Sequence, residues 1–269
     1  MVVKARRILS RDGVTLDDVA CRHRAGRGRV EAAKEIYAIV FVRRGCFVRS
    51  AEGAEAVLDP TIAYCGSPGV EERFDHPHDH GDDCTALLLE PGLVASMWGG
   101  EAALPAGPVP TSPEIDLEHR LLLGAARGDA DPHDLVERAL GLAARLLEQA
   151  DPRRVASGRP ATARARRALS DGAREALAAD PDRSLQDLAR DLAVSPHHLS
   201  RVFSAANGST VSRHRMRLRA RIAMERLAAG DHDLARLAAD LGFADQSHLC
   251  RVVRAETGST PAALRAALA

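Results

Sequence analysis

The sequence lacks any long hydrophobic run. No stretch approaches the roughly 18 uncharged apolar residues that a membrane-spanning helix needs. The opening residues, MVVKARRILSRDG, also lack the apolar core of about 7–15 residues that a secretory signal peptide carries. We therefore expect a soluble, cytoplasmic protein with no membrane partner.

Neither cysteine nor net charge defines the protein. The five cysteines are an odd number and lie far apart, which predicts reduced thiols rather than a disulfide framework. The chain carries 37 basic and 37 acidic residues, so its formal net charge is zero. The balance is uneven, however: residues 160–269 hold 17 Arg against 12 acids, leaving 20 basic and 25 acidic residues for 1–159. A basic C-terminal half is a modest indication of nucleic-acid binding.

The common catalytic fingerprints are missing too. The chain has no Gly-x-Ser-x-Gly elbow, no Walker loop and no Gly-x-Gly-x-x-Gly motif. His76 and Cys84 could form a nucleophile pair, but the sequence places no third group to orient them. We expect no enzyme activity, no catalytic residue and no cofactor.

The first ~100 residues have the pattern of short β-strands. IYAIVFVRRGCFVRS (36–50) consists of two apolar runs broken by Arg-Arg-Gly, which predicts a hairpin. Further short apolar runs bounded by Pro and Gly favour a small sandwich or barrel. The Pro- and Gly-rich stretch 99–114 is typical of a connector.

Two helical patterns follow the connector. Apolar residues recur with helical spacing over Ile115–Arg127 and Leu135–Leu147, and the polar segment between them is short, which predicts an antiparallel pair. Their apolar stripes exceed what one helical pair buries alone, so we expect them to meet a second subunit in a C2 homodimer. A second linker covers 150–160, and the chain beyond it is helical in pattern.

The helical C-terminal part contains a repeat. LSRVFSAANGST (199–210) returns as LCRVVRAETGST (249–260), and each copy follows a short helix with apolar residues at i, i+3, i+4 and i+7. Ser184 and Asp233 are suited to cap the first helix of each pair, and Ser195 and Asp245 the second. Two short helices joined by a tight turn form a helix-turn-helix, whose second helix enters the DNA major groove. The alternative is a helical bundle with an accidental repeat, which the matching caps and Gly-Ser-Thr endings disfavour.

The segment between the copies is strongly basic. As a helix from Val211 to Ala229 it would extend ~28 Å, so two reading units could enter successive major grooves ~34 Å apart. Arginines on its solvent side would then pair with phosphates. The alternative is an ordinary solvated basic helix. The arginines expected to contact phosphates, one of them from the second unit, are Arg213, Arg217, Arg219 and Arg254.

The stretch DLARLAADLGFADQSHLCRVVRAETGSTPAALR resembles the second helix-turn-helix of AraC/XylS-type transcription regulators. The resemblance is strong over residues ~160–269 and weak elsewhere. Two positions depart from it: Cys250 stands where Ser is frequent, and Val211 occupies the place of Pro261 in the second copy. By this resemblance the residues that approach base edges are His197, Ser200, Arg201, Gln246, Ser247, His248 and Arg251.

A histidine-rich stretch, FDHPHDHGDDCT (74–85), indicates a metal site at first sight. Imidazole, carboxylate and thiolate suit zinc or copper, and histidines at alternate positions of an extended segment point the same way. The stretch resembles part of a cupin metal motif but lacks its Glu and its later His. It also resembles sensor arms of AraC-type regulators that have no metal set. We therefore predict no metal at His76, His78, His80 and Cys84, and a pocket rim or a plain loop instead.

Taken together, the sequence predicts an α+β protein. We expect a β-rich, cupin-like sensor domain over 1–110, a helical dimerisation element and linker over 111–159, and an all-α DNA-binding domain with two helix-turn-helix motifs over 160–269. The expected function is sequence-specific transcription regulation under an effector sensed in the N-terminal domain. Expected partners are double-stranded DNA, a small-molecule effector and RNA polymerase. The alternative is a cupin-fold metal-binding protein or metalloenzyme with a helical appendage.

Overall fold

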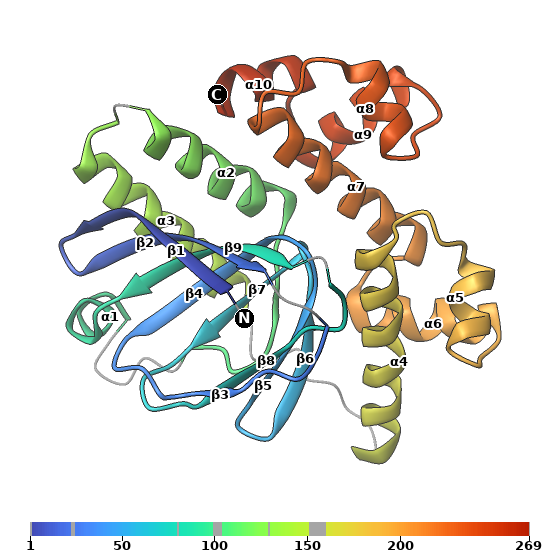
Figure 1. Cartoon of the computed structure of the whole chain (residues 1–269), viewed down its shortest axis with the longest axis horizontal. Helices are drawn as coiled ribbons and strands as arrows, with labels where there is room; N and C mark the ends of the chain where they lie inside the picture. Colours follow the sequence, from blue (N-terminus) through green and yellow to red (C-terminus); the bar gives the residue numbers. More distant parts are fainter. Residues whose placement is uncertain are drawn as a thin grey trace.

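The computed structural model describes residues 2–22, 25–79, 81–98, 104–128, 130–150 and 160–268. A β-rich N-terminal domain is followed by a pair of helices and then by a helical C-terminal domain that lies along one side of it (Figure 1). The predicted α+β class is confirmed. None of the helices in these ranges is long and apolar enough to cross a membrane.

The N-terminal domain consists of two antiparallel sheets. The larger has the order β1 (Val2–Arg11), β2 (Val14–Arg22), β9 (Asp82–Leu89), β4 (Tyr37–Arg44), β7 (Ile62–Gly66), β10 (Val109–Pro110). The smaller has the order β3 (Val30–Glu31), β8 (Glu72–Asp75), β5 (Phe47–Ala51), β6 (Ala54–Leu58). Apolar side chains that include Val40, Phe47 and Tyr64 pack together inside this domain and form one core cluster.

The predicted hairpin over residues 36–50 is wrong. Its two strands, β4 and β5, belong to different sheets, and β5 pairs instead with β6 and β8. The chain changes sheet at Gly45, whose φ is 86° and whose missing Cβ would lie 2.5 Å from the Gly81 carbonyl oxygen. The glycine that suggested a hairpin turn is therefore needed at a corner where two backbones come close together.

The two predicted helices after the connector are present. α2 (Pro113–Arg127) and α3 (Pro132–Gln149) begin at Ser112 and Asp131, whose side chains accept the hydrogen bonds that cap them. They pack against each other and against β1, and the short helix α1 (Pro91–Trp98) precedes them. Their pairing is thus confirmed.

The apolar stripes of α2 and α3 find their partners inside the same chain. Leu142 and Leu146 are buried in a core that they share with the larger sheet, and Leu140 and Leu147 pack against it. The expectation that these stripes need a second subunit to cover them is therefore wrong. The homodimer itself stays a prediction, as do the domain limits at 110 and 159.

The C-terminal domain contains seven helices within the described residues. They are α4 (Pro160–Ala179), α5 (Leu185–Asp191), α6 (Pro196–Asn207), α7 (Val211–Ala228), α8 (Leu234–Asp240), α9 (Gln246–Thr257) and α10 (Pro261–Leu268). The four predicted caps, Ser184, Ser195, Asp233 and Asp245, each accept a backbone N–H at the start of α5, α6, α8 and α9. The helix-turn-helix pattern of the sequence is therefore realised twice.

Candidate nucleic-acid interface

We call α5–α6 the first head and α8–α9 the second head. In the first, Leu199 and Phe203 of α6 are fully buried; in the second, Leu249 and Val253 of α9 take the same places. Each second helix ends at a glycine in the left-handed region, with φ of 65° and 71°. Helix α7 connects the heads and runs diagonally between them (Figure 1). The packing faces and helix ends of the two heads are thus built alike.

The outer faces of α6 and α9 carry the residues expected to approach base edges. Arg201, Gln246, Ser247 and Arg251 are exposed and Ser200 is half-buried; none of these side chains has a polar partner among the described residues. They are free to bond to DNA. The side chain of His197 lies outside the described part of the structure.

His248 is held by the turn before its own helix. The backbone N–H of Ala244 donates to its Nδ1 at 3.3 Å, and its ring meets the Phe243 ring edge-on at 5.4 Å. Because Nδ1 accepts, the neutral ring carries its hydrogen on Nε2. In this state His248 can present a hydrogen-bond donor at the start of α9.

Two of the four arginines expected at phosphates are engaged inside the protein. Arg219 is buried and donates to the carbonyl oxygen of Gly242 at 2.6 Å. Arg217 donates to the carbonyl oxygen of Thr111 at 2.7 Å and lies 3.7 Å from a Glu256 carboxylate oxygen. The expectation that these two side chains face solvent is therefore wrong, because α7 lies between the heads and the N-terminal domain instead of standing free. We call this domain the sensor, after the role that the sequence predicts for it.

The other two phosphate candidates are available. Arg213, in the first turn of α7, and Arg254, in the last turn of α9, are exposed, and neither side chain has an ion pair within the described residues. An exposed guanidinium without an internal partner can bond to a phosphate in two places at once.

A buried charged cluster joins the sensor to the C-terminal domain. Asp59, in the turn between β6 and β7, accepts from Arg174 of α4 at 2.8 Å and from the backbone and hydroxyl of Thr61. His214 of α7 lies with its Nε2 3.6 Å from the same carboxylate oxygen. Although burial alone would raise the pKa of Asp59, Arg174 and then His214 lower it well below its ordinary value. Asp59 therefore stays ionised and ties one sensor turn to two helices.

A second polar contact lies further along α7. Glu225 accepts from Arg120 of α2, and Arg43 of β4 lies 3.7 Å away from its other oxygen. One turn earlier, Arg221 donates to the Thr111 carbonyl at 3.1 Å and lies 3.5 Å from Asp116. Burial opposes the charge of Asp116, but Arg120 and then Arg221 lower its pKa. Together with His214 at the first contact, Arg221 and Glu225 fasten α7 to the N-terminal domain and to α2 over about three turns.

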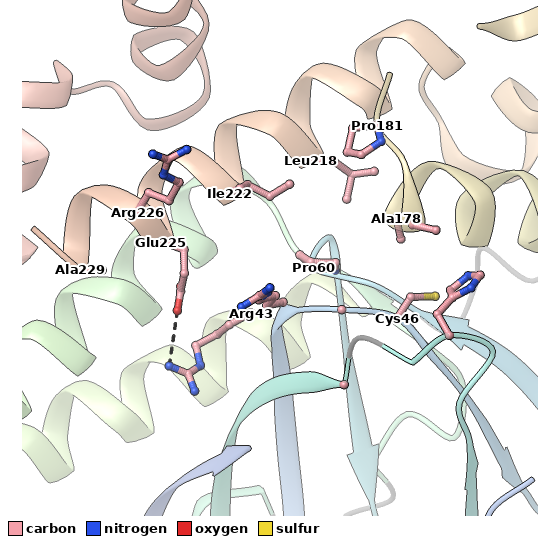
Figure 2. Close-up of a pocket in the computed structure, with 15 residues that line it drawn as sticks. Arg43, Cys46, Pro60, Ala178, Pro181, Leu218, Ile222, Glu225, Arg226 and Ala229 are labelled. Carbon is pink, nitrogen blue, oxygen red and sulfur yellow. Dashed lines mark ion pairs between the residues drawn. The ribbon is translucent and has the colours of Figure 1, made fainter. Parts of the chain in front are cut away.

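A cavity of about 600 Å³ lies between these two contacts (Figure 2). Leu218 and Ile222 of α7 and Ala178 of α4 give it an apolar side. On the sensor side lie Arg43 and Arg44, and the ion pair between Arg43 and Glu225 crosses from one side to the other. Arg44 is exposed and has no ion partner among the described residues. The space suits a small molecule with an apolar body and an acidic group.

The histidine-rich stretch does not converge on one point. His76 is buried and its Nε2 lies 2.8 Å from Asp82, whereas His78 is half-exposed and faces Glu175 of α4 at 3.9 Å. The expectation that these two point the same way is wrong because β8 ends at Asp75 and the chain bends. His80 lies outside the described residues. In the part of the chain that the structure describes, no three His, Cys, Asp or Glu side chains are placed to hold a metal ion.

The thiol beside His76 is a poor nucleophile. Cys84 lies with its Sγ 3.6 Å from Asp82, and burial and then the Asp82 carboxylate raise its pKa well above its ordinary value. The pKa of Cys21 on the neighbouring strand is raised to about 12 for the same two reasons. A thiol that stays protonated does not attack a substrate, so this cluster is unsuited to nucleophilic catalysis.

The residues that join the two domains carry no recognisable signal in the sequence. Asp59 stands in an ordinary Leu-Asp-Pro turn, and Arg174 and His214 lie within helical patterns that contain other polar residues. Burial of all three follows from the docking of distant segments, which no local pattern encodes. The one related feature of the sequence is the excess of arginine in the α7 segment, which by itself predicts a phosphate-binding surface and not a contact between domains.

A match to a protein family covers most of the two heads. Residues 188–267 match a family model described as a helix-turn-helix domain, and no curated protein matches the chain. Among solved structures, ToxT from Vibrio cholerae O395 aligns with 95% of this chain and 98% of its own, at 9% identity and a TM-score of 0.38. The Schizosaccharomyces pombe Cnp3 cupin domain covers 36% of this chain and 71% of its own, at 10% identity and a TM-score of 0.31. The family match confirms the resemblance to AraC/XylS-type regulators over the two heads.

Proposed function

We propose that this protein is a sequence-specific DNA-binding transcription regulator whose two heads read successive major grooves. The observation that carries the proposal is the pair of exposed faces on α6 and α9, joined by one helix, on which Arg201, Gln246, Ser247 and Arg251 have no polar partner among the described residues. With 18 residues, α7 is ~27 Å long, close to the ~34 Å that separates successive major grooves on one side of DNA. Arg201 and Arg251 supply the strongest base contacts, because an arginine can bond to a guanine edge in two places.

Phosphate contacts come from arginines that have no internal partner. Arg213 and Arg254 take this role in the proposal, in place of Arg217 and Arg219. Such contacts add affinity without sequence information, and each one increases the dependence of binding on salt. Removal of a base-contacting arginine should therefore change sequence preference, whereas removal of a phosphate-contacting arginine should change affinity for all sequences and its dependence on salt.

The test starts with selection of duplexes from a random pool by the purified full chain. Arg251→Ala is expected to weaken binding to the selected site by about 1–3 kcal/mol and to relax base preference at one position. Arg254→Ala, the matched variant one turn away, should weaken binding to all sequences alike and make the salt dependence shallower. No enrichment over repeated rounds would refute the function, and identical behaviour of the two variants would refute the assignment of roles. The mass of the complex on one site shows whether one copy or two are bound.

We further propose that the effector occupies the cavity between sensor and α7 as a small organic acid with an apolar body. Its carboxylate would compete with Glu225 for Arg43 and would find a free cation in Arg44. Since the Arg43–Glu225 pair links β4 to α7, such a ligand changes one of the contacts that position the heads. This is how a signal in the sensor would reach DNA.

Thermal shifts with pairs of acids and their amides test the effector site. We expect acids to raise the melting temperature and their amides to have a smaller effect, because a ligand that binds the native state stabilises it. Ile222→Trp fills the space and should abolish the shift, whereas Arg44→Gln should weaken it. Equal shifts for acids and amides would contradict the acidic group, and shifts that survive Ile222→Trp would place the effector elsewhere.

A further inference from the structure

The side chain of Arg219 reaches both heads at once. It lies at the middle of α7 and is 8% exposed. One nitrogen donates to the carbonyl oxygen of Gly242, in the turn of the second head, at 2.6 Å. The other donates to the carboxylate of Asp182 and lies 3.4 Å from the Pro181 carbonyl oxygen, both in the loop that enters the first head. The guanidinium also lies over the Phe243 ring, 6.0 Å from its centre.

Two side chains lie close to the turn of the second head. A Cβ on Gly242 would lie 2.5 Å from an oxygen of the Asp182 side chain and 2.8 Å from a nitrogen of Arg219. The Asp182 carboxylate of the first head's loop therefore reaches the turn of the second head. In the first head the equivalent turn residue is Ala193, whose side chain is exposed to solvent. The contact between heads thus has one side built on a glycine and the other on Asp182.

A neighbouring arginine supports the same junction. Arg215, one helical turn before Arg219, donates to the carbonyl oxygen of Arg183 at 2.5 Å. Arg226 bonds to Asp231 and, at 2.7 Å, to Asp240 at the end of α8. Arginines along α7 thus attach the first head at one end and the second at the other. Arg219 alone among these three contacts both heads.

We propose that Arg219 fixes the separation of the two reading helices and thereby sets the spacing of half-sites that the protein accepts on DNA. The inference rests on the proposed function. One extra base pair between half-sites moves one of them by about 3.4 Å and turns it by about 34°, since a helical turn contains 10–10.5 bp. Heads held rigidly cannot follow such a change, whereas heads joined only by α7 can. Arg219 acts here as a positioning residue that does not touch DNA.

Two substitutions separate this role from a phosphate contact. Arg219→Met removes the charge and the bonds, and Arg219→Lys keeps the charge but cannot hold both heads, because an ammonium group lacks the planar fork of arginine. A phosphate contact would survive the change to Lys in large part. Asp182→Ala removes the partner of Arg219 on the first head. The Asp182 side chain is 64% exposed, so this variant should fold and can replace an Arg219 variant that does not. Arg213→Met, an exposed arginine of the same helix, is the matched control.

The first measurement needs no DNA. Spin labels on cysteines introduced at Ala205 of α6 and Ala255 of α9, with Cys21 and Cys250 changed to Ser, report the distribution of distances between heads. Both labelled positions are exposed. We expect a narrow distribution in the parent protein and in Arg213→Met, and at least a doubling of its width in Arg219→Met, Arg219→Lys and Asp182→Ala. An unchanged width in folded Arg219 variants overturns the proposal.

The second measurement uses duplexes with the selected spacing and with one base pair added or removed. The parent is expected to lose about tenfold or more in affinity for the altered spacings, and the Arg219 variants no more than about threefold. Binding to a duplex with a single half-site should stay unchanged in all variants except Arg213→Met. In the contrary outcome Arg219→Met loses affinity equally for all spacings and shows a shallower salt dependence, with the affinity largely restored in Arg219→Lys. That result would make Arg219 a phosphate contact and overturn the proposal. If the parent selects no DNA the proposed function fails, and the distance measurement still decides whether Arg219 holds the heads together.

Discussion

At the scale of single residues, the two helix-turn-helix turns reach one backbone conformation with different residues. Ala193 in the first head has φ of 53° and Gly242 in the second has φ of 65°. A residue with a Cβ costs roughly 1–2 kcal/mol in this region, and glycine does not. In the second head a Cβ would in addition displace the ends of the Asp182 and Arg219 side chains, which lie 2.5 and 2.8 Å from its place. In the first head the only cost of a glycine at position 193 is the greater conformational freedom that it gives the unfolded chain.

Ala193→Gly should therefore raise the free energy of unfolding. We expect a gain of about 0.5–1 kcal/mol, since the relief of the left-handed strain exceeds the added freedom of the unfolded chain. Denaturant unfolding of the full chain measures the change. Gly208→Ala is the reverse control: its φ is 65° and its surroundings are open, so it should lose a similar amount. A gain or a loss in both variants would contradict this reasoning.

His119 shows at the same scale how burial makes one side chain sensitive to pH. Its ring stacks on Phe41 with 4.6 Å between centres, and its Nε2 is buried with no hydrogen-bond partner in the described structure. Burial, aided by the charges of Arg120 and Arg43 and opposed by Asp116, lowers the pKa of His119 to about 3. Between about pH 3 and pH 6.5 the ring therefore stays neutral in the folded protein, whereas an unfolded chain would bind a proton there.

The stability of the protein should fall between pH 6.5 and pH 3 for this reason. In the unfolded chain the imidazole has a pKa of about 6.5 and binds a proton that the buried ring of the folded chain does not bind. At pH 5 this lowers the free energy of unfolding by about 2 kcal/mol. His119→Leu should flatten this part of the pH dependence while leaving the part below pH 3 in place. Unfolding curves at pH 7 and pH 5 decide the point. An equal drop in both proteins would show that other groups carry it.

At the scale of elements, helical periodicity identified α2, α3 and the heads but not what covers them. The apolar positions of Leu140 and Leu147 are those of a helix with a buried face, and that face could equally meet a sheet or a second chain. The strand that contacts both helices, β1, has ten residues, but its sequence VVKARRILSR shows no regular apolar alternation. In the same way the pattern of α7 showed many arginines, but not that Thr111, Gly242 and Glu256 would accept or balance them. Local spacing predicts an element, whereas its partners depend on residues far away in the chain.

Replacing Leu140 and Leu147 together with Glu tests the corrected placement. Had the two helices formed a dimer seam, this change would give a folded monomer. Since both side chains pack against the core of the larger sheet, we expect a loss of about 2–4 kcal/mol in unfolding free energy instead. Light scattering and denaturant unfolding are measured on the same samples. A monomer of undiminished stability, obtained from a parent that is dimeric, would restore the dimer seam.

At the scale of the whole molecule, the sensor and the heads are joined by buried charges as well as by apolar contacts. Asp59 contacts Arg174 of α4 and faces His214 of α7, and neither the carboxylate nor the guanidinium is accessible to water. The formal charges of the two halves, negative at the N-terminal side and positive at the C-terminal side, are thus partly neutralised where the halves meet. Part of the basic excess noted in the sequence therefore serves this junction rather than DNA.

Asp59→Asn should be among the most costly single changes in this protein. The change removes the carboxylate that Arg174 bonds to at 2.8 Å and leaves the buried guanidinium only the more distant Asp171, at 3.7 Å, which costs about 3–5 kcal/mol at pH 7. Because the pKa of Asp59 is lowered on folding, its contribution is present above the unfolded value of about 3.9 and is lost as the pH falls below it. The difference between parent and variant should therefore shrink on acidification below pH 4. Asp171→Asn is the control: it removes the weaker partner of Arg174, 3.7 Å away and 22% exposed, while Asp59 still balances the guanidinium, so it should change stability by less than about 1 kcal/mol.

Helix α2 has a consequence for how regulators of this kind can be recombined. Leu117 and Leu121 on one side of it complete the core of the second head, while Leu122 and Leu123 on the other belong to the core of the sensor. Gly124 of the same helix lies so close to α10 that a Cβ there would stand 3.3 Å from the Leu268 backbone. A gene fusion that begins at Pro160 and borrows a foreign sensor would leave the second head with an open apolar side. A fusion that begins at Ser112 includes α2 and so completes the core of the second head. It also exposes Leu122 and Leu123, which face the larger sheet in the intact protein. A DNA-binding unit that is to be transferred therefore needs a new partner for this face of α2.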